Sequence, residues 1–353
     1  MNEREQWAEA AERIRAQMTA NHAGNWGMDL NQWDWVPGVG LIALLEYGLE
    51  ARHTDTLEQL KRWMERNWAK SAEAAVINAV APCAIFPELY RQTGDERYRA
   101  ETERMAAWLV GTAPRTREDA FEHTVTENVA FAEQVWADTV FMAVLFLARA
   151  AALLGRTDYA AEAQRQTLLH LRLLADEENG VLYHGWNCVA GNHMSAVRWA
   201  RANAWIAVAV PMIVQETQAL VPVPQELKER YIRLMDGLLC YQQEDGLWST
   251  VLDRPDFYRE TSGSAGIGCG LLKALEADLL PDEARCRLAA ERALAAVLAQ
   301  VGPDGSVGGV SGGTPVMEDE EAYGRIPVYP TLYGQGLALM LLAQRLKGAI
   351  ADE

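Results

Sequence analysis

The sequence predicts an all-helical protein, in which six inner helices form a ring and six outer helices surround it as an (α/α)6 toroid. A repeat is the first observation behind this prediction, because an Ala- and Leu-rich helix alternates with a more polar helix along the 353 residues. The second is the spacing, since the turns from inner to outer helices are short and the connectors from outer to inner helices are long. We expect one domain, 1–353, with the long connectors at one end of the ring.

The predicted inner helices are apolar on nearly all sides. Residues 140–147 read VFMAVLFL, as a helix buried on all sides requires. The six segments are GLIALLEYGLE (40–50), APCAIFPELYRQ (81–92), TVFMAVLFLARAAALLG (139–155), NAWIAVAVPMIVQET (203–217), AGIGCGLLKALEA (265–277) and YGQGLALMLLAQRL (333–346).

The predicted outer helices are amphipathic. In one of them, Tyr98, Met105 and Leu109 share an apolar face. The six segments are EREQWAEAAERIRAQM (3–18), TLEQLKRWMERNW (56–68), ERYRAETERMAAWLV (96–110), YAAEAQRQTLLHLRLL (159–174), PQELKERYIRLMDGLL (224–239) and PDEARCRLAAERALAAVL (281–298). The chain starts with an outer helix and ends with an inner one, which closes a ring.

An open superhelical solenoid, which also alternates helices, is the alternative to the ring. The connectors favour the ring, because long loops on one side would lie at one end of a barrel. Three connectors contain a turn dipeptide followed by apolar residues, which predicts short hairpins. These dipeptides are Asn179-Gly180, Asp245-Gly246 and Asp304-Gly305.

Composition limits the partners and the compartment. The net charge of −17 disfavours nucleic acid and anionic membranes, and an anionic substrate would have to be small and met by a few placed cations. No apolar run is long enough to span a bilayer, and the charged first residues do not resemble a signal peptide. The five cysteines are widely spaced in mostly apolar contexts, as expected of reduced residues. We therefore expect a cytoplasmic protein.

Tryptophan placement indicates where ligands bind. Flat aromatic rings at the mouth of a cavity suit the faces of a sugar ring, although packing of the loops would explain them equally well. Eight of the twelve tryptophans lie in the long connectors or where inner helices begin: Trp26, Trp33, Trp35, Trp136, Trp186, Trp199, Trp205 and Trp248.

Two segments contain the candidate polar side chains. Asp138, in QVWADTVFMAVLFLA, starts the third inner helix, where it could cap the helix, act as a catalyst, or do both. In VRWARANAW, Arg201 stands between Trp199 and Trp205 and could bind a carboxylate while the rings hold a sugar, or could simply be part of a charged helix start.

Other chemistries find little support in the sequence. The pair Gly38 and Gly40 lacks the third glycine of a dinucleotide fingerprint, and His184 and His193 lack the spacing of a zinc protease site. The acidic run 318–321 is more typical of a solvated loop than of a calcium site. We therefore predict neither a cofactor nor a catalytic metal.

Several motifs together resemble glycoside hydrolase family 105, the unsaturated rhamnogalacturonyl hydrolases, which are relatives of family 88. They occur in the family's order across nearly the whole chain. The motifs are LYRQTGDERY, PRTREDAFEH, QVWADTVFMAVLFLA, LYHGWN, WARANAWIAVA, DGLWSTVLDRPDFYRETSGSAG, GGVSGGTPV and YGRIPVYPTLYGQG.

The resemblance implies an (α/α)6 barrel that hydrolyses a 4,5-unsaturated uronic acid from the non-reducing end of a short oligosaccharide, here of the pectin or rhamnogalacturonan type. It implies that Asp138 is the general acid/base, and that substrate contacts come from a wider set. Asn78 stands where some members have a second active-site Asp, and it can orient a hydroxyl or water but cannot exchange a proton. The implied or candidate substrate contacts are Trp33, Trp35, Asn78, His123, His184, Trp199, Arg201 and Trp205.

One acid/base suffices for an unsaturated uronide, because its C4=C5 bond is an enol ether. A protonated Asp138 would donate to C4, and water would then add at C5. Burial beside rings such as Trp136 should raise the pKa of Asp138, whereas the start of a helix favours the carboxylate. A sugar epimerase or another hydrolase on the same ring, and a helical-repeat scaffold that binds peptides, are the competing hypotheses.

Overall fold

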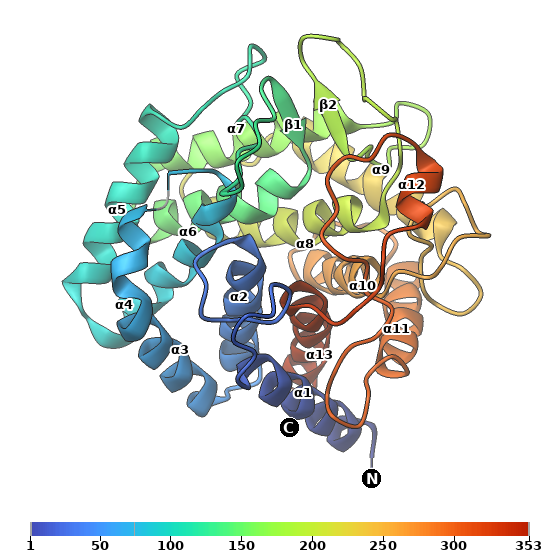
Figure 1. The fold of residues 1–353 in the computed structure, drawn as a ribbon, viewed down its shortest axis with the longest axis horizontal. Coiled ribbons are helices and arrows are strands. Elements are labelled where there is room, and N and C mark those ends of the chain that lie inside the picture. The colour runs from blue at the N-terminus through green and yellow to red at the C-terminus, as the bar shows by residue number, and fades with distance from the viewer. Residues whose placement is uncertain (1, 74, 352–353) are drawn as a thin grey trace.

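The computed structural model describes residues 2–73 and 75–351 and has the predicted alternation of inner and outer helices (Figure 1). The inner helices are α2 (Trp35–Glu50), η2 (Asn78–Ile85) continuing into α4 (Phe86–Thr93), η3 (Val140–Val144) continuing into α6 (Leu145–Leu154), α8 (Ala200–Thr217), α10 (Thr261–Glu276) and α13 (Leu332–Ala351). The outer helices are α1 (Glu3–Thr19), α3 (Thr54–Asn67), α5 (Glu96–Gly111), α7 (Thr157–Leu174), α9 (Gln225–Tyr241) and α11 (Glu283–Leu298).

The inner helices form a closed ring. Going round it, α2 contacts η2, η2 contacts η3, α6 contacts α8, α8 contacts α10, α10 contacts α13, and α13 contacts α2 again. The first outer helix, α1, packs on α13, and the two lie side by side in Figure 1. The predicted (α/α)6 ring is therefore confirmed, and the open solenoid is wrong.

Helix boundaries follow from residues with the matching local preference. Asp34 caps α2, Asp95 caps α5 and Asp282 caps α11, each accepting a hydrogen bond from a backbone N–H of the first turn. At the other end of the barrel, α4 and α6 stop at Gly94 and Gly155, whose φ angles are 66° and 65°. These left-handed glycines produce the short turns from inner to outer helices.

The three predicted turn dipeptides form a structural repeat of their own. Each glycine has a positive φ and lies so close to the backbone of an outer helix that a Cβ would meet a carbonyl oxygen. Gly180 lies against α9, Gly246 against α11 and Gly305 against α1, so each hairpin tip packs on the next outer helix round the ring. Isolated antiparallel bridges, Ala175 to Leu182 and Val301 to Val307, close two of these hairpins.

Two inner helices begin irregularly, and both begin beside candidate residues. The second starts with the 3-10 helix η2, which contains Pro82, and Asn78 is its first residue. The third contains the π-helix η3, which starts two residues after Asp138. Departures of this kind from α-helical geometry are frequent at functional sites.

The remaining elements are short. They are the 3-10 turn η1 (Trp68–Glu73), the helix α12 (Glu320–Gly324), and the antiparallel strands β1 (Gln134–Trp136) and β2 (Gly185–Asn187). None of the helices in the described chain is long and apolar enough to cross a membrane. All five cysteines are free thiols, as predicted.

Candidate active site

A cavity of about 550 Å³ opens at the end of the barrel where the inner helices begin. Its wall combines aromatic rings with a small number of polar groups, as expected of a site for a small molecule. It is lined by Trp26, Trp35, Asn78, His123, Val125, Glu127, Val129, Phe131, Trp136, Asp138, Trp199, Arg201, Gly313, Thr314, Pro315 and Tyr329.

Asp138 is placed in this wall by a short hairpin. Strand β1 ends at Trp136, which pairs with Gly185 of β2, and Ala137 N donates to His184 O at 3.2 Å. Asp138 then lies within the first turn of the third inner helix, whose first backbone bond runs from Val140 N to Ala137 O. The carboxyl group therefore faces the cavity from inside the first turn, and the alternative that it is only an N-cap is wrong.

His184 supports the carboxyl group from behind the cavity wall. Its Nε2 lies 3.5 Å from Asp138 Oδ2, and its Nδ1 lies 2.7 Å from Tyr323 Oη. Met317 N donates to the same tyrosine oxygen at 3.3 Å. Because that oxygen already accepts a hydrogen bond, we assign its own proton to His184 Nδ1, which leaves Nε2–H directed at Asp138. His184 is buried and is absent from the lining of the cavity.

The pKa of Asp138 lies below the ordinary value. Burial is the largest influence and acts to raise the pKa, as the sequence suggested. The influence of His184 is the largest that opposes burial, those of His123 and Arg201 follow, and together they outweigh it. Burial also lowers the pKa of His123 to about 4 and lowers that of His184, so both rings are neutral near pH 7. The 3.5 Å contact with His184 and the charge of Arg201 therefore help to keep Asp138 ionised in the free protein.

Several buried polar atoms of the cavity have no hydrogen-bond partner among the described residues. Such atoms are rare in folded proteins and call for a ligand or water. Asn78 and His123 are held together by backbone bonds, from Asn78 N to Thr124 O at 3.1 Å and from His123 N to Gln134 O at 2.9 Å. The unpartnered atoms of cavity residues include Asn78 Oδ1, His123 Nδ1, Trp199 Nε1 and Arg201 Nε.

Arg201 lies between two aromatic rings, but one of them differs from the prediction. Its guanidinium carbon is 4.3 Å from the Trp199 ring centre and 4.5 Å from that of Tyr333. Trp205 is fully buried against Phe141 and lies outside the cavity lining. The prediction that Trp205 is the second ring is therefore wrong, because Trp205 lies one helical turn deeper in α8 and packs on Phe141 in the core.

The guanidinium of Arg201 is also already engaged by the protein. Nη1 donates to Ser311 O and Nη2 donates to Gly312 O, both at 2.9 Å, and Nη1 lies 3.6 Å from Glu260 Oε1. Glu260 is fully buried, caps α10, and accepts from Ser311 N at 2.9 Å. Arg201 thus secures the loop 311–314 through its two terminal nitrogens and presents only Nε without a partner. This geometry contradicts the predicted bidentate carboxylate clamp.

The two predicted tryptophans of the first connector have different positions. Trp35 lines the cavity and stacks on Tyr333, with ring centres 5.1 Å apart. Trp33 stacks on Trp63 and donates from Nε1 to Ala79 O at 3.1 Å, so it faces a neighbouring cavity instead. The sequence placed both tryptophans in one connector but could not tell which one faces the ligand.

Ring contacts continue along the wall of the cavity and behind it as an aromatic belt, in which His184 and Tyr333 are buried behind the lining. Neighbouring members have ring or guanidinium centres between 4.3 and 6.0 Å apart. In order, the belt consists of Phe131, Trp136, His184, Trp199, Arg201, Tyr333, Trp35 and Trp26. His123 stacks on Trp136 beside it, with ring centres 4.0 Å apart.

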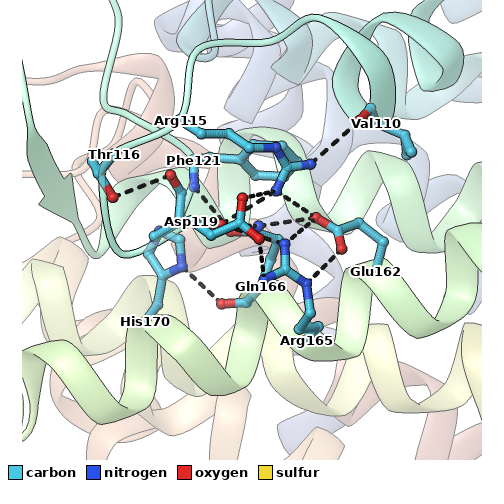
Figure 2. A network of polar contacts seen from close by, with 10 residues as sticks. Val110, Arg115, Thr116, Asp119, Phe121, Glu162, Arg165, Gln166 and His170 are labelled. Atoms are coloured by element: carbon cyan, nitrogen blue, oxygen red, sulfur yellow. Dashed lines mark hydrogen bonds and ion pairs between the residues drawn. The ribbon is translucent and has the colours of Figure 1, made fainter.

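A polar network anchors the loop that leads to His123 (Figure 2). Arg115 donates to Glu162 of α7 at 2.8 Å, and Phe121 N donates to Gln166 Oε1 at 2.9 Å. Between them, Asp119 adopts a left-handed φ of 61°, and its carbonyl accepts from Gln166 Nε2 at 2.9 Å. The network fixes the loop on α7 two residues before His123, which explains how a loop histidine comes to be buried and precisely oriented.

Sequence reasoning missed three residues of the site: Glu260, Tyr323 and Tyr333. Each was present in a motif quoted above without being singled out: Glu260 in DGLWSTVLDRPDFYRETSGSAG, and both tyrosines in YGRIPVYPTLYGQG. An acidic residue just before a Gly- and Ser-rich helix start was a readable signal for Glu260. No local signal identifies the tyrosines, whose partners lie far away in the sequence.

Comparison with known proteins gives consistent findings. A family model described as Glycosyl Hydrolase Family 88 matches residues 10–349. The unsaturated rhamnogalacturonyl hydrolase YesR of Bacillus subtilis is 34% identical over 322 residues, covering 89% of this chain and 90% of that protein. The unsaturated 3S-rhamnoglycuronyl hydrolase of an Alteromonas species is 28% identical over 223 residues, covering 60% of this chain and 51% of that protein.

Solved structures share the same fold. A possible member of the GH105 family from Salmonella enterica has a TM-score of 0.92 and 27% identity, covering 99% of this chain and 96% of that chain. An unsaturated glucuronyl hydrolase from Bacillus sp. GL1 has a TM-score of 0.72 and 18% identity, covering 96% of each chain. The second likeness concerns the fold only.

Proposed function

The chain belongs to glycosyl hydrolase family 88, and from this premise we propose that it removes a 4,5-unsaturated uronic acid from the non-reducing end of a short oligosaccharide. The motif resemblance found in the sequence is confirmed by the family match. The 34% identical relative is an unsaturated rhamnogalacturonyl hydrolase, which favours a substrate released from rhamnogalacturonan by a polysaccharide lyase. Five free cysteines suit a reducing compartment, so we further propose that the enzyme works in the cytoplasm.

One observation carries the proposal. Asp138 is the only carboxyl group of the described cavity lining that comes from an inner helix, and the other one, Glu127, lies on an exposed loop. Glycosidases that act directly at the anomeric carbon need two carboxyl groups facing each other across the bond. A single carboxyl group beside Asn78 and two neutral histidines suits an enol ether instead, since one group can both give and take the proton.

The reaction uses Asp138 first as an acid and then as a base. Its proton goes to C4 of the unsaturated uronide, and positive charge develops at C5 and the ring oxygen. Water adds at C5 while the Asp138 carboxylate takes up one of its protons. The resulting hemiketal opens to a ketone, and the remaining sugar leaves from C1.

Substrate binding has to supply the proton, because Asp138 is ionised in the free protein. A uronate carboxylate that enters a water-poor cavity places a second negative charge near Asp138. Like charges and loss of water both raise the pKa of a carboxyl group. We therefore infer that the enzyme takes up a proton when the uronide binds, and that the substrate itself converts Asp138 into the acid.

His184 and Tyr323 keep the carboxyl group in place through this cycle. An Nε2–H directed at Asp138 stabilises the carboxylate that forms after proton transfer to C4. Burial holds His184 neutral, so it orients Asp138 without competing for the proton. Asn78 Oδ1 is available to accept a hydrogen bond from a sugar hydroxyl or from the attacking water.

The substrate carboxylate needs a positive neighbour, and Arg201 is the only cation of the described cavity lining. Its terminal nitrogens hold the loop 311–314, so we infer a single hydrogen bond through Nε together with the charge. Trp199 and Tyr333 fix the plane of the guanidinium. We propose that Trp35 and Trp199 contact the sugar ring and that His123 and Asn78 make polar contacts with the substrate. His184 acts through Asp138 and not on the substrate directly.

The proposal is tested by mixing the purified protein with oligosaccharides produced by a rhamnogalacturonan lyase. The ultraviolet absorbance of the conjugated C4=C5 bond should disappear, because hydration destroys the conjugation. The same oligosaccharides with the double bond reduced beforehand should yield no released sugar. Release of sugar while the absorbance persists would refute the mechanism, and no change in either would refute the activity.

A further inference from the structure

A second cavity adjoins the active site on the outer side of the first connector. It has a volume of about 420 Å³, within the range of about 300–1,000 Å³ that is usual for small-molecule sites. Trp26 is the one residue common to the two described linings. We name this space the connector cavity, and it is lined by Gly24, Asn25, Trp26, Asp29, Gln32, Trp33, Asp34, Val36, Pro37 and Thr126.

Trp26 forms the boundary between the two cavities. Its side chain is 48% exposed, although it belongs to the aromatic belt and contacts the edge of Trp35, with ring centres 6.0 Å apart. A Cβ on Gly313 would collide with the Trp26 ring, so the ring rests on bare backbone. A large exposed ring that is held on one side and free on the other is the usual platform for a sugar.

A hydrogen bond between two side chains also lies where the linings of the two cavities meet in sequence. Thr126 Oγ1 donates to Asp34 Oδ2 at 2.6 Å and so joins the loop 125–131 to the first connector. Thr126 faces the connector cavity, while its neighbours Val125 and Glu127 face the active site. Trp26 and this contact therefore lie between residues of the two linings.

The two cavities differ in charge. The active-site lining contains a cation, Arg201, beside the carboxyl groups of Asp138 and Glu127, whereas the described lining of the connector cavity contains carboxyl and amide groups and no cation. Asp29 is already satisfied by Gly24 N, Asn31 N and Gln32 Nε2, with hydrogen bonds of 3.2, 3.0 and 2.9 Å. Acceptors and amides beside tryptophan suit the hydroxyl groups of a neutral sugar and repel an acidic one.

We propose that the connector cavity binds the leaving sugar, the neutral ring attached to the unsaturated uronate, and that Trp26 is the platform over which this ring passes. The proposal rests on the proposed function, because it assigns the uronate to the active-site cavity. It explains why a cavity that contains a cation and a cavity that contains none among its described lining residues share one exposed tryptophan. Gln32 is the residue best suited to test it, since its side chain is exposed and lies outside the active-site lining.

The experiment compares two substrates that share the uronate. One is the methyl glycoside of the unsaturated uronic acid, which has no second ring, and the other is the disaccharide of the same uronic acid with rhamnose. We expect wild-type kcat/KM to be higher for the disaccharide. Gln32→Ala should lower kcat/KM for the disaccharide about tenfold, as loss of a sugar hydrogen bond and its contacts predicts, and should leave the methyl glycoside unchanged.

Two further variants control the result. Gln225→Ala removes a glutamine that also donates to a carboxylate, Glu229, but on the outer surface of α9, and both substrates should be unaffected. Gln32→Lys adds a cation to the cavity and should not improve the disaccharide if the bound ring is neutral. A gain in kcat/KM with Gln32→Lys would overturn the assignment to a neutral sugar.

The outcomes separate this inference from the proposed function. If the wild-type protein hydrates neither substrate, the proposed function is wrong. If it hydrates both equally well and Gln32→Ala changes neither, the function stands and the connector cavity does not bind the leaving sugar. If Gln32→Ala weakens both substrates to the same extent, the residue acts on the uronate site and the inference is also refuted.

Discussion

The two ends of the barrel differ in how their buried polar and charged groups are paired. Where the inner helices begin, polar atoms of Asn78, His123 and Arg201 are buried without hydrogen-bond partners in the described part of the chain, and Asp138 lies 3.5 Å from His184. Where the inner helices end, buried charges neutralise one another across the ring. Glu46 of α2 binds Arg149 of α6 at 2.6 Å and Lys273 of α10 at 2.8 Å.

We call the end of the barrel where the inner helices end the closed end, and the end where they begin the open end. The network of ion pairs at the closed end extends further. Lys273 also binds Glu50 at 2.6 Å, and Arg149 lies 3.9 Å from Glu216 of α8 and donates to Ala84 O at 3.0 Å. It thereby links four inner helices and the start of the second. A buried pair loses much of its hydration, and its main effect is that neither partner can be removed without leaving an unpaired charge. The closed end therefore fixes the ring, while the open end keeps its hydrogen-bonding capacity for a ligand.

The sharpest test of this contrast is Asp138→Asn. We expect kcat to fall by about 10²–10⁴-fold, the range that general acid/base groups contribute, while binding of the uronide persists. The melting temperature should stay the same or fall slightly, since the lowered pKa of Asp138 shows that the folded protein favours the carboxylate over a neutral side chain. Ultraviolet assays, calorimetric titration and thermal unfolding provide the three measurements. Near-normal turnover would show that another group supplies the proton.

Lys273→Met tests the opposite end. It leaves Glu46 and Glu50 beside each other with one cation fewer, so the free energy of unfolding should fall by about 3–5 kcal/mol. The kcat at a temperature where the variant is folded should match the wild type. Lys347→Met is the matched control, because Lys347 pairs with Glu276 with a side chain that is 42% exposed, and its loss should change stability by less than about 1 kcal/mol. Equal losses in the two variants would contradict a special role for the buried network.

Tyr323→Phe should affect the open end without disturbing the fold. The variant keeps the ring but removes the hydrogen bond to His184 Nδ1, so that the histidine can adopt either tautomer. We expect kcat to fall about tenfold, KM to change little, and the pH profile of kcat to shift, because Asp138 loses a fixed donor. Tyr90→Phe, which removes an exposed hydrogen bond to Glu96, is the control. An unchanged pH profile of kcat would show that Tyr323 only packs in the core and does not position His184.

The smallest expected effect concerns pH and the closed end. Burial raises the pKa of Glu50 from about 4.5 to about 7, against the pull of Lys273. The folded protein therefore holds a proton that the unfolded chain has lost, and the contribution of Glu50 to stability declines as the pH rises from about 4.5 to 7. Glu50→Gln should gain stability relative to wild type between pH 5 and pH 8, measured by urea unfolding. Glu58→Gln, on the exposed face of α3, should show no such gain.

The fold was predictable from the sequence because its determinants are local. Apolar inner segments, amphipathic outer segments and turn dipeptides such as Asn179-Gly180 depend only on near neighbours. The ring followed from their order and from the lengths of the connectors. Asp138 was predictable for a related reason, since it begins an inner helix within a motif that resembles a known family.

The partners of the site residues were not predictable in the same way. His184 and Tyr323 are 139 positions apart, and Arg201 and Ser311 are 110 apart. Hydrophobic periodicity contains no information about contacts at such separations. The same reason explains the errors over Trp205 and Trp33, which lie in the right segments but face the core or the connector cavity. Helix position is a local property, whereas the direction in which a side chain faces a cavity depends on the whole ring.

Closure of the ring by its last helix has a consequence for biosynthesis. Residues 332–351 form the sixth inner wall and also supply Tyr333, against which Arg201 and Trp35 are stacked. During translation, α1, α2 and α10 must therefore wait for a neighbour that emerges from the ribosome after them. Until then their apolar flanks stay open to solvent and to chaperones. The enzyme acquires a complete substrate pocket only when this final helix docks.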